Sequence, residues 1–78
     1  MKMTRYFEWS RRRPDRAAIR LSWIQRVIAC PERQVVQADG RIRCWARIVE
    51  AGNRYLRVVL LSDGETVHNA FFDRRFRP

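Results

Sequence analysis

The ten residues RIRCWARIVE, Arg41–Glu50, decide the fold of this chain. Positions 42, 44, 46 and 48 are apolar, whereas positions 41, 43, 45 and 47 are arginine, arginine, tryptophan and arginine. Because successive side chains of a strand point to opposite faces, this alternation predicts a strand with one face on a core and the other open. The dipeptide Asp39-Gly40, typical of tight hairpin turns, stands directly before it. The stretch is therefore predicted to be the second strand of a hairpin.

Turn residues divide the second half of the chain into four predicted strands. Two further turns, Ala51-Gly52-Asn53 and Ser62-Asp63-Gly64, follow the hairpin. Short connections favour antiparallel pairing of consecutive strands, so we expect a four-stranded antiparallel meander. The predicted strands are Gln34–Ala38, Arg41–Glu50, Tyr55–Leu61 and Thr66–Phe72.

Two helices are predicted in the first half of the chain. Thr4 is a suitable N-cap for a short helix that reaches Arg13. Pro14 is expected to end or kink that helix, because proline disfavours helical backbone at the residue before it. In the second helix, apolar residues recur at steps of 4, 3 and 4 and therefore share one face: Ala17, Leu21, Ile24 and Ile28.

The sequence allows two starting points for the second helix but only one end. Asp15 is a suitable cap for an early start, and Leu21 is a suitable first residue after a turn. Pro31 ends the helix in either case. Helices before a meander predict an α+β fold, with two N-terminal helices packed on one face of the sheet and residues 1–78 forming a single domain.

The charge of the chain points to a polyanionic partner. Its 78 residues hold 17 lysines and arginines against 8 acidic residues, which gives a net charge of +9 and excludes a nucleic-acid mimic. Lys2 is the one lysine, and the other basic residues are arginines, whose planar fork suits phosphate. Codon bias in a GC-rich genome is the alternative explanation for the arginine content.

The cysteine and hydropathy patterns bear on metal binding, on the redox compartment and on membrane association. Cys30 and Cys44 lack CxxC spacing and His68 is the single histidine, so the ligands do not suffice for zinc, and no metal or cofactor is predicted. Both cysteines are expected to be buried thiols in a reducing compartment. Since no apolar run approaches the roughly 18 residues of a membrane span and no apolar signal segment begins the chain, we expect a cytoplasmic protein without a membrane partner.

The sheet face opposite the helices is predicted to carry the function. Arginines hold phosphates and aromatic rings stack on bases, which is what binding of single-stranded RNA requires. The alternative is a solvated face on which Trp45 shields the sheet. In the last strand, Val67 and Phe71 are expected in the core, and Ala70 and Phe72 on the open face. The predicted open-face site consists of Arg41, Arg43, Trp45, Arg47, Tyr55, Arg57 and His68.

His68 is the candidate proton acceptor, because an unperturbed imidazole titrates near neutral pH. Arg43 and Arg57 are expected to stabilise charge on a phosphate, and Tyr55 is a second candidate acid. A hydrogen-bonded strand histidine without a chemical role is the alternative. Arg74 is a candidate RNA contact in a basic cluster around Phe76, which either frays or closes over the sheet.

Several segments together resemble a family of small uncharacterised bacterial domains grouped with the RelE/BrnT-like toxin superfamily. The segments that carry the resemblance are Ile24–Ile28 with Pro31, Asp39–Arg41, Arg54–Val59 and Thr66–Arg74. The resemblance implies two helices on one side of an antiparallel sheet and a basic concave face for RNA. It also implies metal-independent cleavage of messenger RNA, free or on the ribosome, and a cognate antitoxin protein that covers this face.

The sequence departs from the active members of that superfamily in two respects. Lys2 lies outside the sheet, so a lysine base is missing, and Phe71, Phe72 and Phe76 stand where some toxins have a tyrosine. Three hypotheses therefore stay open. The chain is a metal-independent endoribonuclease toxin, a non-catalytic nucleic-acid-binding module, or a small structural or protein-interaction domain.

Overall fold

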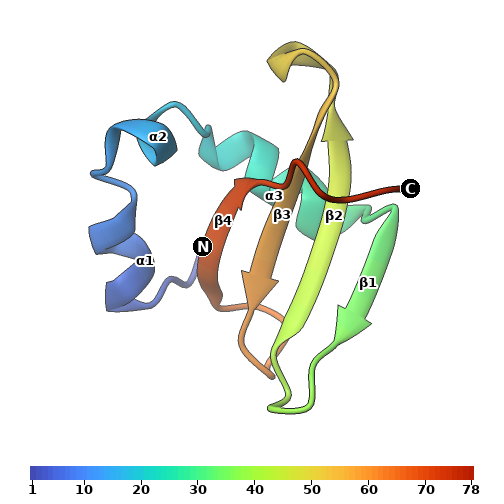
Figure 1. Ribbon diagram of the computed structural model, residues 1–78. Helices are drawn as coiled ribbons and strands as arrows, with labels where there is room; N and C mark the ends of the chain where they lie inside the picture. Colours follow the sequence, from blue (N-terminus) through green and yellow to red (C-terminus); the bar gives the residue numbers. More distant parts are fainter.

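The computed structural model describes residues 1–78 and has an α+β fold (Figure 1). The four strands form one antiparallel sheet in the order β1-β2-β3-β4, so the predicted meander is confirmed. The helices are α1 (Arg5–Ser10), α2 (Pro14–Ala17) and α3 (Leu21–Ala29). The strands are β1 (Arg33–Val36), β2 (Ile42–Ile48), β3 (Arg54–Leu60) and β4 (Val67–Phe72), with a 3-10 turn, η1 (Val49–Ala51), between β2 and β3.

The chain forms three helices where two were predicted. The hydroxyl of Thr4 accepts a hydrogen bond from the backbone N–H of Phe7 at 3.1 Å, which confirms the predicted cap of α1. The backbone of Arg13 is extended, as expected before a proline, and Pro14 begins the separate turn α2. Ala17 belongs to that turn and is exposed, so it does not continue the apolar stripe of α3.

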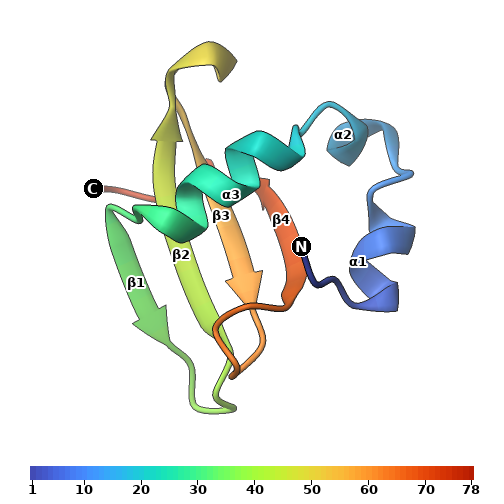
Figure 2. The same cartoon turned by 180° about the vertical axis from the view of Figure 1, so that it is seen from behind.

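Helix α3 crosses one face of the sheet (Figure 2). It begins at Leu21, the later of the two predicted starts, and buries Ile24 and Val27. The even positions of β2 and β3 meet them in one core cluster, as the alternation predicted: Cys44, Ala46 and Ile48 with Leu56, Val58 and Leu60. None of the helices has the length and apolar character needed to cross a membrane.

The prediction that both cysteines are buried is wrong for Cys30. Cys44 is buried in the core, but Cys30 is exposed, because it follows the last residue of α3 and lies off the apolar stripe of the helix. Burial raises the pKa of the Cys44 thiol.

A β-bulge in β4 overturns the predicted faces of that strand. Leu60 pairs with Val67 whereas Val59 pairs with Asn69, which leaves His68 as an extra residue. Beyond the bulge, Leu56 pairs with Phe72 and Val58 with Ala70, so both side chains face the core with their partners. Phe71 pairs with Arg57 and lies on the opposite face, although the alternation placed it in the core.

The N-terminal segment closes the sheet at β4. The backbone N–H of Thr4 donates to Val67 at 3.0 Å, and the N–H of Val67 donates to Lys2 at 2.9 Å. These bonds accompany a parallel bridge between Met3 and Val67, and α1 lies beyond this strand (Figure 1). Strand β1 forms the other edge and exposes Val35 and Val36.

The cap of α1 provides a test of this N-terminal anchoring. Thr4→Ala removes the acceptor of the Phe7 N–H and is expected to lower the free energy of unfolding by about 0.5–2 kcal/mol. Thr4→Ser keeps the hydroxyl and serves as the control. Urea unfolding measures both variants, and equal stability of Thr4→Ala and the parent protein would contradict the assignment.

Candidate nucleic-acid interface

The sheet face opposite α3, here called the arginine face, carries most of the predicted site. Pairing of β2 with β3 aligns Arg43 with Val59, Trp45 with Arg57, and Arg47 with Tyr55. Since the even positions of both strands are buried against α3, these odd positions share the other face. Arg41 directly precedes β2 and is exposed, with its Nε 3.7 Å from Oδ2 of Asp39.

Arg57 lies at the centre of the arginine face. Its guanidinium lies 5.6 Å from the ring centre of Trp45 and 5.1 Å from that of Phe71. Its Nη1 is 3.7 Å from Oδ2 of Asp73. Burial, followed by the positive charge of Arg43, lowers the pKa of Arg57. Arg57 therefore has one carboxylate partner and one like-charged neighbour.

The Nε–H groups of Arg43 and Arg57 lack hydrogen-bond acceptors. The Nε atoms of both residues are buried without a hydrogen-bond partner, and no carboxylate lies within ion-pair distance of Arg43. A donor left unpaired in this way costs about 1–3 kcal/mol. A phosphate held by the neighbouring Nη groups would offset the repulsion between the two charges, because guanidinium and phosphate form strong charge-assisted hydrogen bonds.

Arg16 extends this cationic cluster from α2, and the sequence analysis missed it. Its Nη1 donates to Oδ1 of Asn69 at 2.6 Å, and its guanidinium lies 5.2 Å from the ring centre of Phe71. Phe71 therefore contacts both Arg16 and Arg57. The sequence offered no signal for this arrangement, because it depends on the separate turn α2 and on the bulge that turns Phe71 to this face.

The segment Asp73–Pro78, here called the cover segment, crosses the arginine face (Figure 1). Phe76 stacks on Trp45 with ring centres 5.0 Å apart and planes inclined by 18°, and it also contacts Tyr55. Of the two alternatives for this part of the chain, closure over the sheet is correct. Trp45 lies on the predicted face, but with 6% of its surface exposed it is not an open platform for bases.

Asp73 fixes the start of the cover segment. Its carboxylate accepts a hydrogen bond from Nε1 of Trp45 at 3.0 Å and from the backbone N–H of Arg75 at 3.1 Å. Burial raises the pKa of Asp73, but these hydrogen bonds and the charge of Arg57 outweigh that effect and lower it. An anion is thus already bound to the central arginine of this face.

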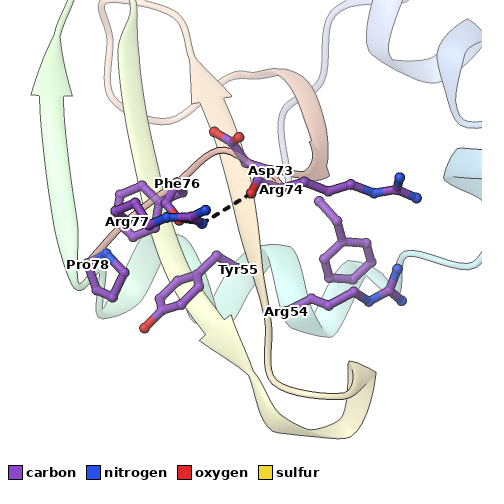
Figure 3. A pocket seen from close by; sticks show the side chains of 8 residues that line it. Arg54, Tyr55, Asp73, Arg74, Phe76, Arg77 and Pro78 are labelled. Atoms are coloured by element: carbon purple, nitrogen blue, oxygen red, sulfur yellow. Dashed lines mark hydrogen bonds between the residues drawn. The ribbon is translucent and has the colours of Figure 1, made fainter.

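Arg74 belongs to the cover segment, and Tyr55 of β3 lies beside it. A cavity of about 260 Å³ opens between this segment and the neighbouring strand ends, as Figure 3 shows. Its lining consists of Arg54, Tyr55, Phe72, Asp73, Arg74, Phe76, Arg77 and Pro78. A second cavity, of about 320 Å³, joins Arg54 and Arg74 to Arg16 of the cationic cluster. Arg47 is exposed beside Tyr55.

The structure does not bring His68 to the other predicted catalytic residues. His68 lies in the bulge, three residues or roughly 10 Å along β4 from Phe71, the cross-strand partner of Arg57. Its Nδ1 is hydrogen-bonded to the hydroxyl of Thr4 at 3.1 Å, and its ring stacks on Tyr6 with centres 5.1 Å apart. Burial, followed by the charge of Arg41, lowers the pKa of His68, which favours the neutral imidazole.

Comparison of the chain with models of protein families, with curated proteins and with solved structures gave no match in any of the three.

Burial of Trp45 leads to a prediction about stability. Trp45→Ala removes the ring under Phe76 and the donor to Asp73, and is expected to lower the free energy of unfolding by about 3–5 kcal/mol. Trp9→Ala is the matched control, because Trp9 is 58% exposed and its loss should change stability by less than about 0.5 kcal/mol. Thermal and urea unfolding measure both variants. Equal, small losses would show that the cover segment does not close over Trp45 in solution.

Proposed function

We propose that this protein binds RNA as a single strand and holds the phosphate backbone on the arginine face. The observation that carries the proposal is the pair formed by Arg43 and Arg57. The positive charge of Arg43 acts on Arg57, and the Nε atoms of both residues are buried without a hydrogen-bond partner. Asp73 is the single carboxylate within ion-pair distance, and it pairs with Arg57 alone. Trp45, Phe71 and Asp73 stabilise Arg57, but the charge of Arg43 has no carboxylate partner and repels that of Arg57. An anionic ligand would offset this repulsion.

The overall charge supports the same partner. The net charge of +9 leaves many arginines without an internal carboxylate, and a polyanion is the partner that neutralises several at once. Arg16 adds a third cation to the central pair, and Arg41 and Arg47 extend the arginine face along β2. Codon bias explains the number of arginines but not the position of Arg43, Arg47 and Arg57 beside Trp45 and Tyr55 on one face.

The contacts of the cover segment support a nucleotide chain as the ligand. The carboxylate of Asp73 binds Arg57, and the ring of Phe76 stacks on Trp45. A nucleotide offers the same two groups, an anion and a flat ring. RNA at the centre of the face therefore competes with the cover segment, whereas RNA at Arg16, Arg41 and Arg47 does not.

Salt-dependent binding tests this proposal. Affinity for a labelled oligouridylate is expected to fall linearly on a log–log plot against salt, and Arg43→Gln and Arg57→Gln should each reduce the slope by about 0.7. Arg26→Gln is the matched control, because Arg26 has the same charge but belongs to α3 and is paired with Glu50 through hydrogen bonds of 2.9 and 2.7 Å.

Unfolding curves of the three variants exclude loss of the fold as the cause. Binding that does not depend on salt, or slopes that Arg26→Gln lowers as much as Arg43→Gln, would contradict a phosphate site on the arginine face. No binding at any salt concentration would favour the hypothesis of a structural or protein-interaction domain.

A RelE/BrnT-like ribonuclease toxin is the second candidate function. The observation that favours it is His68, whose pKa is lowered by burial and then by the charge of Arg41. This favours the neutral imidazole, which can accept a proton. Such an enzyme deprotonates the 2′-hydroxyl of RNA, which attacks the adjacent phosphorus and expels the 5′-oxygen. A cognate antitoxin protein would then cover the arginine face.

Cleavage assays separate the two candidates. If His68 is the general base, His68→Asn is expected to lower the cleavage rate by about 10²–10⁴-fold while RNA still binds. Product analysis on free and ribosome-bound message measures this rate. Cleavage at the parent rate by His68→Asn would remove the histidine from the mechanism, and no cleavage by the parent protein would leave the binding module as the function.

A further inference from the structure

Three aromatic side chains form a row beside the arginine face, in which two are exposed and His68 is half-buried. Tyr6 and Trp9 project from α1 with ring centres 6.1 Å apart, and Tyr6 stacks on His68 of β4 at 5.1 Å and 29°. Trp9 is 58% exposed and Tyr6 is 45% exposed, so these two rings are open to solvent. We call Trp9, Tyr6 and His68 the aromatic row.

The fold does not need this row for its core. Phe7 and Ser10 are the buried residues of α1, and they face the sheet on the other side of that helix. Tyr6 and Trp9, three residues apart, share the outward face. Exposing two large aromatic rings together forgoes the free energy of burying them, which is why such pairs mark binding surfaces.

Cations flank the row at both ends. Arg5 stands four residues before Trp9 and Arg12 three residues after it; both are exposed, and neither has an ion-pair partner. At the other end, His68 is followed in β4 by Asn69, which accepts a hydrogen bond from Arg16 of the cationic cluster at 2.6 Å, so the row adjoins the cations of the arginine face. Exposed rings flanked by arginines match a chain of bases joined by phosphates.

We propose that the aromatic row of Trp9, Tyr6 and His68 is the base-stacking platform for single-stranded RNA whose phosphates bind the arginine face. This inference rests on the proposed function and adds the place where bases are bound. The sequence predicted that Trp45 and Tyr55 stack on the bases. In the structure Phe76 stacks on Trp45 and contacts Tyr55, so the proposed base platform is a different set of rings. Stacking on exposed rings is tolerant of sequence, since every base has a flat face.

The test compares two strands that differ only in their bases. One is a short single-stranded oligouridylate, and the other is an abasic strand of equal length with the same phosphates. The parent protein is expected to bind the strand with bases more tightly. Trp9→Ala and Tyr6→Ala should each weaken binding of the oligouridylate by about tenfold and leave binding of the abasic strand unchanged.

Substitution of His68 separates stacking from proton transfer. His68→Phe keeps a ring on Tyr6 and is expected to bind the oligouridylate as the parent does, whereas His68→Ala weakens it. Trp9→Phe is the conservative control at the other end of the row. Melting temperatures of all variants show whether α1 stays folded, and Trp9→Ala should not change them because the ring is exposed.

The outcomes distinguish the platform from the phosphate site. If Arg43→Gln weakens both strands but Trp9→Ala and Tyr6→Ala weaken neither, the phosphate site stands and the aromatic row is not a base platform, which leaves a protein partner as its occupant. Equal losses for both strands in Trp9→Ala would also overturn the inference, because they would show an effect that does not depend on bases. Failure of the parent to bind either strand would overturn the proposed function itself.

Discussion

The side chain of Arg57 lies between two aromatic rings and one carboxylate, and the rest of the arginine face depends on this arrangement. Trp45 and Phe71 contact its guanidinium, and Asp73 pairs with it. Asp73 in turn begins the cover segment, so the position of Phe76 follows from the charge of Arg57. Arg43 lies diagonally across from Arg57 in the sheet, and no carboxylate of this arrangement neutralises its charge.

The excess of arginine over acidic residues explains why aromatic rings serve as partners of the guanidinium groups. With 17 basic and 8 acidic residues, carboxylates cannot pair with every cation, and the exposed pairs that do form contribute little. Ring faces accept other guanidinium groups instead: Arg16 on Phe71, Arg33 on Phe76, and Arg54 on Phe72. The rings over the centre of the sheet are therefore engaged within the chain, and the open rings are those of Tyr6 and Trp9 on α1.

The faces of β2 and β3 were predictable because alternation is local. The core positions of Cys44 and Leu56 and the outward positions of Arg43 and Arg57 follow from a period of two. The faces of β4 were not predictable, because the extra residue at His68 reverses the face of every later position. The local sequence of β4 contains no residue pattern that indicates this bulge.

Parts of the site could not be predicted because they depend on contacts between residues far apart in the sequence. Closure of the cover segment depends on Phe76 reaching Trp45, which lies far away in the sequence, so the sequence left both alternatives open. Tyr6 and Trp9 were missed because only the buried side of α1, at Phe7, matched a pattern. Pro14 did signal the end of the first helix, but not that α2 would carry Arg16 to Asn69.

The resonances of the arginine Nε–H groups test the central claim most directly. The Nε atoms of Arg43 and Arg57 are buried, so their protons are shielded from exchange with water and are suited to detection by NMR. On titration with a single-stranded oligouridylate, these two resonances are expected to shift with the binding isotherm, while that of Arg26 on the opposite side stays unchanged. Unmoved resonances of Arg43 and Arg57 in a protein that binds the strand would contradict a phosphate site on the arginine face.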